Sequence, residues 1–306
     1  MNTSMAPDHR RERFDCADRV IRIGFWMNSL LMALKLSAGS YGNSEAVFAD
    51  GLESACDFIA IMASWIAIRM GRQPLDGKHP YGHGRAESIS AVFVSLVIVF
   101  TGSGILLQAI RSILEGNPDP PRLVAVLAAF VTIGVKEWLY RFSIAVGSRL
   151  ESPALTALAK DHRKDALTSV ATLIGVSGAF FGFRILDPIA AGLTAFFIFH
   201  IGYQTFRAAA HDLMDGKPPE PLISSIIKLA ESIEGVEHVH EIKGRRSGQF
   251  IIVDLKLDMD PEMTVKMSHD IATKVKRSIF KRFSNVGDVM IHINPHDEKH
   301  KDLTRL

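Results

Sequence analysis

Apolar residues dominate six long stretches in the first two-thirds of the chain, with short polar, glycine-containing or proline-containing segments between them. A helix needs about 20 consecutive apolar residues to cross the hydrocarbon core of a bilayer, and each stretch approaches or exceeds that length. The separating segments carry residues that end helices. We therefore predict a cytosolic tail at 1–17 and six transmembrane helices at 18–40, 46–70, 87–114, 122–147, 156–182 and 188–210.

The pattern changes after about residue 211, where apolar residues recur at helical or alternating spacing over shorter segments. Helical spacing predicts helices at 219–235 and 264–283, and alternation predicts strands at 236–246, 249–260 and 288–295. The order helix, strand, strand, helix, strand is typical of a ferredoxin-like α+β sandwich, with the helices on one face of a three-stranded sheet. The predicted architecture is thus an α-helical membrane protein: a six-helix bundle at 18–210 and a small cytosolic domain at 211–306.

Charge and composition exclude some classes of function and predict how the chain is oriented in the membrane. The net charge of +2 offers no case for nucleic-acid binding, and two cysteines without a Cys-x-x-Cys motif cannot form a disulfide framework. Basic residues precede the first span and flank the loop between spans two and three, whereas the opposite loop YGNSE has none. The positive-inside rule therefore places both termini in the cytoplasm, in a multi-pass protein of the cell (inner) membrane. We interpret the first apolar run as a retained helix and not as a signal peptide.

Acidic residues interrupt two of the predicted spans at helical spacing. Glu53 and Asp57 lie four residues apart in the second span, and Asp161 and Asp165 lie four apart in the fifth. Residues at this spacing share a helix face. Because a charged side chain at bilayer depth costs at least about 2.5 kcal/mol, such residues point to a site that holds or passes a cation. The alternative is a structural role, in which intramembrane acids pair with basic residues to hold the bundle together. Basic neighbours of the span-five pair are Lys160, Arg163 and Lys164, and a similar pairing within the fourth span would involve Lys136, Glu137 and Arg141.

Several longer segments resemble one family of membrane proteins, the cation diffusion facilitators. They are ADGLESACD, HPYGHGRAES, KEWLYRFSIAVGSRLESPALTALAKDHRKDALTS, GVEHVHEIKGRRSG and DVMIHINP, in the family's order over nearly the whole chain. The resemblance implies a homodimeric exporter of divalent transition metals that exchanges them for protons. It also implies that the C-terminal domain serves dimerisation and regulation.

The resemblance implies a transport site made of Glu53, Asp57, Asp161 and Asp165. Zinc-type members usually carry histidine at the first position of one or both pairs, whereas this chain has Glu53 and Asp161 there. An all-oxygen site favours harder ions, so we expect Mn²⁺, with Fe²⁺ next and Zn²⁺ still a candidate. Asp50 shares the face of Glu53 and Asp57 and is left open between an entry-path acid and a structural partner. His162 is expected to cap or pack.

Further candidate residues lie outside the membrane. Asp76, His79 and His83 in the loop between spans two and three suit a small metal site, or a structural or gating loop. In similar proteins, the positions of Arg85 and Asp215 form a charged pair that joins the bundle to the cytosolic domain. The family's cytosolic metal site, which in similar members lies between the paired cytosolic domains, corresponds to His240, Asp254, His269 and His292. Asp254 stands where histidine is frequent, and Asn294 stands where aspartate is usual, so this site is either lost or adapted to a harder ion.

Three functions remain as hypotheses. The first is a metal/proton antiporter for Mn²⁺ or Fe²⁺, and the second is a Zn²⁺, Co²⁺ or Cd²⁺ exporter of the same family. The third is a membrane sensor or scaffold that does not transport. We do not expect an enzyme or a cofactor, because the TGSG segment lies mid-helix without the preceding strand or the lysine of a phosphate loop. The expected partners are metal ions, protons, lipid and a second copy of the chain, but no nucleic acid.

Overall fold

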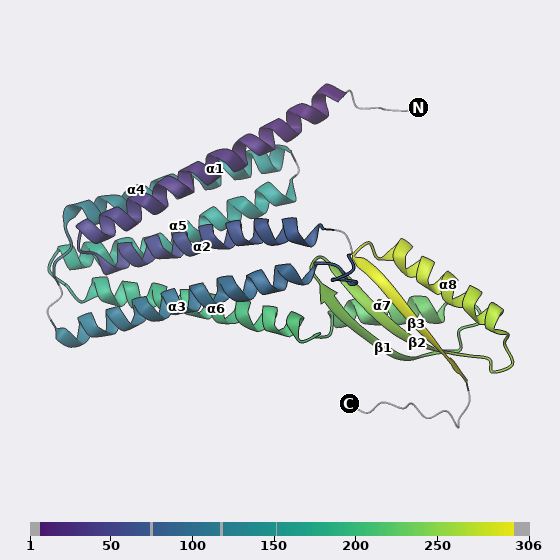
Figure 1. Cartoon of the computed structure of the whole chain (residues 1–306). Helices are drawn as coiled ribbons and strands as arrows, with labels where there is room; N and C mark the ends of the chain where they lie inside the picture. Colours follow the sequence, from purple (N-terminus) through teal and green to yellow (C-terminus); the bar gives the residue numbers. More distant parts are fainter. Residues whose placement is uncertain (1–6, 74–75, 117–118, 151, 297–306) are drawn as a thin grey trace. The chain divides into compact units, whose positions relative to one another are not determined.

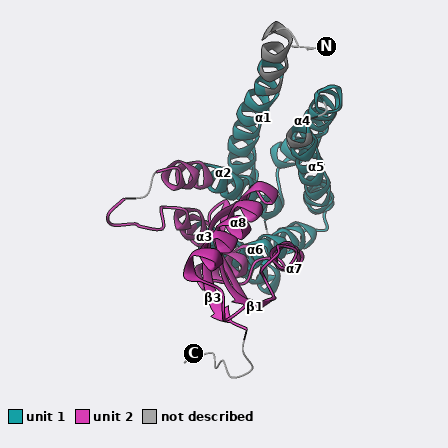
Figure 2. Ribbon diagram, turned by 90° about the vertical axis from the view of Figure 1, so that its right-hand side faces the viewer, with its two compact units in different colours: residues 1–62, 94–204 teal, residues 63–93, 205–306 magenta. Residues whose placement is uncertain are grey.

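The structure is a computed structural model that describes residues 7–73, 76–116, 119–150 and 152–296 (Figure 1). It divides into two compact units, coloured separately in Figure 2. The first comprises Met1–Met62 and Val94–Gln204, and the second comprises Ala63–Phe93 and Thr205–Leu306. Three long helices contribute residues to both units. The predicted domain boundary at 210/211 remains a prediction.

Six long helices form where six spans are predicted. They are α1 (Pro7–Tyr41), α2 (Glu45–Gly71), α3 (Arg85–Glu115), α4 (Leu123–Arg149), α5 (Pro153–Phe180) and α6 (Leu186–Leu213). Five of these helices are long and apolar enough to cross a membrane by length and composition. The exception is α5, which carries five charged residues at positions 160–165. Helix α1 begins before the predicted span because residues 8–17 contain no glycine or proline to stop it.

Small residues bring the helices of the first unit close together. Helix α4 packs along α5 and also contacts α1, as Figure 1 shows. A buried cluster of Val47, Ala125, Ala129 and Val176 joins three of the helices. Gly39 of α1 faces the backbone of Phe48 on α2 with no space for a larger side chain. Because lipid offers no hydrophobic driving force between helices, such close approach is a main source of their association.

The second unit contains the predicted α+β fold, in the order α7 (Glu220–Glu231), β1 (His238–Ser247), β2 (Phe250–Met259), α8 (Val265–Arg282) and β3 (Val286–Pro295). Strand β2 is central: it pairs antiparallel with β1 and parallel with β3. The β1–β2 turn uses Gly248 at a φ of +60°, a conformation that glycine adopts without steric cost. Helix α7 ends four residues before the predicted end at Gly235.

One face of this sheet is buried under the two helices. Alternate residues of β2 point inward, among them Val253, Leu255 and Leu257, and they pack with Ile226 of α7 and Ile279 of α8. Each fully buried side chain of this kind contributes about 1.5–3 kcal/mol of transfer free energy. Helix α8 is capped at its start by Thr264, whose hydroxyl accepts a hydrogen bond from the Met267 N–H at 3.3 Å. The predicted αββαβ domain is confirmed.

Candidate metal centres

The acidic pairs lie on α2 and α5, as predicted. Glu53 is partly buried and Asp57 is exposed on α2, while Asp161 is exposed and Asp165 is partly buried on α5. The start of α5 is defined by Pro153 in its first turn and by the Ser152 hydroxyl, which accepts from the Leu155 N–H. Asp161 therefore lies eight residues into the helix, a rise of about 12 Å from its first residue.

A cavity of about 110 Å³ lies among α1, α2, α4 and α5. Three of the four predicted ligands line it, namely Asp57, Asp161 and Asp165, whereas Glu53 does not. The volume exceeds the roughly 30 Å³ that one water occupies in the liquid, so the space admits a small cation with part of its hydration shell. The tertiary structure thus brings three carboxylates from two helices to one cavity, whose lining also includes apolar side chains such as Phe58 and Ile61.

Two lysines lie against these acids. Lys136 of α4 donates to Asp165 Oδ2 at 2.7 Å and to Asn28 Oδ1 of α1 at 2.8 Å. Lys164 of α5 lies 3.6 Å from Asp161 Oδ1 and 3.9 Å from Asp165 Oδ1. Glu137 pairs with Arg141 within α4, as predicted, and also with Arg163 of α5, but Lys136 does not join that pair. The partners of Lys136 lie on two other helices, α1 and α5.

His162 also lines the cavity and is only 2% exposed. Its ring lies near Gly24 of α1, where an added methyl group would come within 3.5 Å of Nε2. Among the described residues, that nitrogen has no hydrogen-bond partner. The packing predicted for His162 is therefore present, and an imidazole nitrogen lies at the border of the cavity beside the three carboxylates.

Asp50 belongs to a separate buried network. Lys35 Nζ of α1 donates to Asp50 Oδ1 at 2.9 Å and to Ser54 Oγ at 2.6 Å, and Ser169 Oγ of α5 donates to Asp50 Oδ2 at 3.0 Å. The exposed fractions of the lysine and aspartate side chains are 2% and 6%. Of the two roles left open for Asp50, these contacts support the structural partner, since they tie α1, α2 and α5 together.

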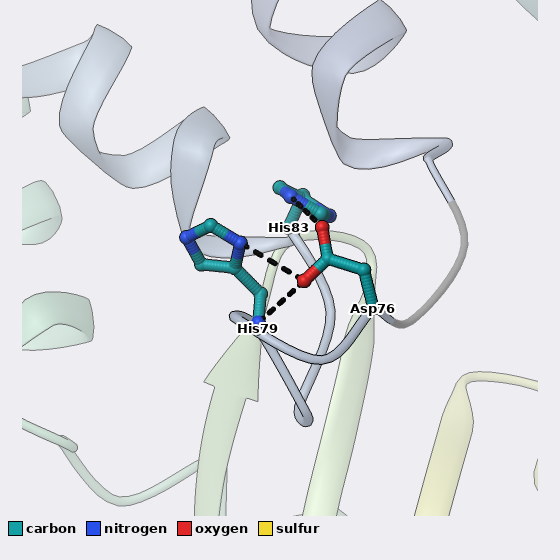
Figure 3. Close-up of side chains that lie close together, drawn as sticks. All are labelled: Asp76, His79 and His83. Carbon is teal, nitrogen blue, oxygen red and sulfur yellow. Dashed lines mark hydrogen bonds and ion pairs between the residues drawn. The ribbon is translucent and has the colours of Figure 1, made fainter.

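The loop between α2 and α3 brings its three predicted ligands together (Figure 3). His79 Nδ1 lies 3.3 Å from Asp76 Oδ1, and His83 Nε2 lies 3.5 Å from Asp76 Oδ2. Among the described residues, this is the one group of three or more potential ligands whose ligand atoms all lie within 4.8 Å of one another. By that measure the four acids on α2 and α5 do not form a closed coordination sphere, and the loop group is the more compact of the two.

Backbone hydrogen bonds position the Asp76 carboxylate and favour its ionised form. The N–H groups of His79 and Lys78 donate to Asp76 Oδ1, and these bonds, together with the adjacent imidazoles, lower the pKa of Asp76 below its usual value. The loop also contacts the second unit's sheet, because the Arg245 guanidinium lies 5.4 Å from the centre of the Tyr81 ring. An ionised carboxylate beside two imidazoles is a donor set that suits a divalent transition metal.

The other predicted residues fall into one close pair and one set that does not come together. Arg85 forms an ion pair with Asp215 and donates to the Leu213 carbonyl at 3.1 Å. His240 Nδ1 lies 3.4 Å from Asp258 Oδ2, a contact that the sequence analysis did not anticipate. In the described part of the chain, the predicted set of His240, Asp254, His269 and His292 does not converge within ligand distance.

The contacts of Lys35 and Asn28 with other helices were not predicted from the sequence. Lys136 was predicted to pair within its own helix. A signal was available for the two lysines, because a lysine inside an apolar helix requires an acidic partner at the same depth. Which acid that partner is depends on helix neighbours and rotation, which the pattern of a single helix does not contain.

The comparisons with known proteins agree with this architecture. The family model for the cation efflux transmembrane domain matches residues 21–214, and that for the cation efflux protein cytoplasmic domain matches residues 218–296. The chain therefore belongs to the cation efflux family of divalent-metal transporters, the cation diffusion facilitators that its sequence resembles. It is an integral membrane protein.

Curated relatives match the chain over most of their length. Manganese efflux system protein MneP of Bacillus subtilis is 36% identical and the match covers 94% of this chain and 99% of MneP. Magnetosome protein MamB of Magnetospirillum gryphiswaldense is 29% identical over 92% of this chain and 95% of MamB. A solved MamM-CTD structure is 26% identical, with a TM-score of 0.25, and covers 25% of this chain and 98% of that one.

Proposed function

We propose that the protein exports Mn²⁺ from the cytoplasm, with Fe²⁺ as the next candidate, in exchange for protons. The observation that carries the proposal is the cavity lined by three carboxylates from α2 and α5. Carboxylate and water ligands suit harder ions such as Mn²⁺. The name of the relative MneP, a manganese efflux protein, supports the same choice. His162 is the feature that favours the alternative, a Zn²⁺, Co²⁺ or Cd²⁺ exporter, because imidazole suits those ions better.

In this proposal Glu53, Asp57, Asp161 and Asp165 form the transport site. Asp57, Asp161 and Asp165 already face the cavity, and Glu53 lies one turn before Asp57 on the same helix. A small rotation of α2 would bring Glu53 to the same space. Because the ligands come from different helices, movement of one helix against the other opens and closes the coordination sphere, which is what alternating access requires.

Proton exchange follows from the ligand chemistry. A cluster of carboxylates without a metal takes up protons, and a metal ion expels them because its ligands must be deprotonated. Metal that enters from the cytoplasm therefore releases protons, and protons from the other side displace the metal. The resulting transporter resides in the cell membrane as a homodimer with both termini in the cytoplasm. The loop group of Asp76, His79 and His83 binds a further metal ion, and the pair of Arg85 and Asp215 anchors the helix ends to the cytosolic domain.

The test is metal flux into proteoliposomes that contain a pH-sensitive dye, with Mn²⁺, Fe²⁺, Zn²⁺, Co²⁺ and Cd²⁺ supplied separately. We expect Mn²⁺ flux coupled to proton movement. The double change Asp161→Asn/Asp165→Asn should reduce flux by at least about a hundredfold, more than outer-shell substitutions typically cost. Glu137→Gln is the matched control, because Glu137 pairs with arginines and does not line the cavity.

Each outcome separates one part of the proposal from the others. Flux that does not respond to the proton gradient would refute exchange, and flux that survives the double change would refute the ligand set. Preference for Zn²⁺ would identify the alternative exporter. A folded wild-type protein without flux for any of the metals would support the sensor or scaffold.

A further inference from the structure

Lys136 is the most buried charged group at the candidate transport site. Its side chain is 5% exposed, compared with 55% for Lys164, and it lines the same cavity as Asp57, Asp161 and Asp165. The ammonium lies 2.7 Å from Asp165 Oδ2 and 2.8 Å from Asn28 Oδ1. Lys136 therefore links its own helix, α4, to both α1 and α5. It also bonds one of the carboxylate oxygens that a metal ion would use.

The Lys136 ammonium and a divalent cation would compete for the same Asp165 carboxylate. A charge-assisted hydrogen bond between buried groups is stronger than one between neutral groups. A divalent cation that binds Asp165 either shares the carboxylate with the ammonium at close range, where like charges repel, or displaces it. If all three carboxylates that line the cavity are ionised, they carry three negative charges against the two positive charges of Lys136 and Lys164, so the ion-free site is balanced when it also binds one proton. One divalent ion carries the same charge as these two ammonium groups.

We propose that Lys136 is a tethered competitor of the transported ion. In the ion-free site its ammonium holds Asp165, and metal loading moves it off Asp165 while Asn28 continues to accept its hydrogen bond. When the metal leaves, Lys136 returns to Asp165. Asp165 is therefore paired with a cation both before and after metal loading, and the competing bond to Lys136 weakens metal binding and so favours release. The inference rests on the proposed transport site and adds a specificity-determining and positioning residue on α4.

The test compares Mn²⁺ binding and flux of the full-length protein with those of Lys136→Met, which keeps the length of the side chain but removes the charge. We expect the variant to bind Mn²⁺ about ten- to a hundredfold more tightly, because loading no longer breaks a charge-assisted hydrogen bond. Maximal flux should fall, because release has lost its competitor. Lys164→Met is the matched control: its ammonium lies farther from the same acids and is half-exposed, so its effect should be much smaller.

Lys136→Gln serves as the second variant, because it removes the charge but keeps a neutral N–H donor on a side chain that is one atom shorter. It should also bind Mn²⁺ more tightly than the wild type. A structure of the wild-type protein with Mn²⁺ needs no variant: it should place Lys136 Nζ beyond hydrogen-bond distance of Asp165 but still bonded to Asn28. An intact Lys136–Asp165 pair beside a bound ion would overturn the inference, as would unchanged or weaker binding in folded variants at position 136.

The proposed function and this inference fail in different ways. If the wild type binds no Mn²⁺, or if Asp165→Asn leaves Mn²⁺ binding unchanged, the transport site itself is refuted. If the wild type binds Mn²⁺ through Asp165 and the two Lys136 variants bind it no more tightly, the site stands and the competitor is refuted. In the Asp165→Asn background Lys136→Met should no longer raise the affinity, because the competing contact is already absent.

Discussion

Two lysines inside the helix bundle each bond one carboxylate, but their surroundings differ. Lys35 and Asp50 lie in a buried network completed by Ser54 and Ser169, and of these four residues Ser54 alone lines the 110 Å³ cavity. Lys136 and Asp165 lie at the cavity itself. A buried ion pair of the first kind holds helices in register, whereas one of the second kind is open to exchange with an ion. The spacing of the acids was visible in the sequence, but it did not distinguish these two environments.

Lys35→Met is expected to destabilise the protein by about 3–5 kcal/mol, because it leaves Asp50 charged, buried and without its counter-ion. The measurement is thermal unfolding of the full-length protein in detergent. The double change Lys35→Met/Asp50→Leu should recover most of the loss, since neither charge remains. A single variant as stable as the wild type would contradict the structural role of this pair.

At the scale of helices and strands, apolar length and periodicity were sufficient to predict all six long helices and the αββαβ order. Both are local properties, since hydrophobic length determines a span and alternation determines a strand. Boundaries were less accurate: α1 starts earlier and α7 ends earlier than the apolar pattern indicates. Such ends depend on capping and on contacts with other elements. The contact between α1 and α2 is one example, because it is made through a glycine whose neighbour lies on another helix.

Gly39→Ala tests this contact. An added methyl group would lie 2.5 Å from the Phe48 backbone nitrogen and 2.7 Å from its Cα, so α1 and α2 would have to separate. We expect a loss of stability of about 1–3 kcal/mol, the usual cost of overpacking. The control is Gly104→Ala on α3, where an added methyl meets nothing within 4 Å and should be neutral or slightly stabilising. Unfolding temperatures of the two variants in detergent provide the comparison, and equal values would contradict it.

For the molecule as a whole, the orientation in the membrane is predicted from the distribution of basic residues among the loops and not from helix packing. The polar loop between α2 and α3 carries basic residues, and the loop between α1 and α2 carries none. This asymmetry is the signal that orients membrane proteins during insertion. From it we predict that the loop group of Asp76, His79 and His83 lies on the cytoplasmic side, together with the C-terminal domain.

Cysteine labelling with a membrane-impermeant maleimide tests the orientation. Cys16 is exposed and Cys56 is buried, so Cys16 is the expected site of reaction. We expect labelling in inverted vesicles and not in right-side-out vesicles. In a Cys16→Ser background, Tyr41→Cys, at an exposed position near the end of α1, should show the opposite pattern. Labelling of Cys16 from the outside would reverse the proposed topology and the direction of transport.

The number and order of the elements and the paired acids were predictable from the sequence, because hydrophobic length, periodicity and i, i+4 spacing are local features. The family followed from the resemblance of whole segments, and that resemblance selected the four candidate ligands. The loop group was also readable, since its three ligands lie within eight residues. The cavity that joins α2 to α5, the exclusion of Glu53 from it, and the two lysine partners came only from the tertiary structure. A partner across the bundle is selected by helix rotation and by the close approach that small residues permit, and these depend on all the helices at once.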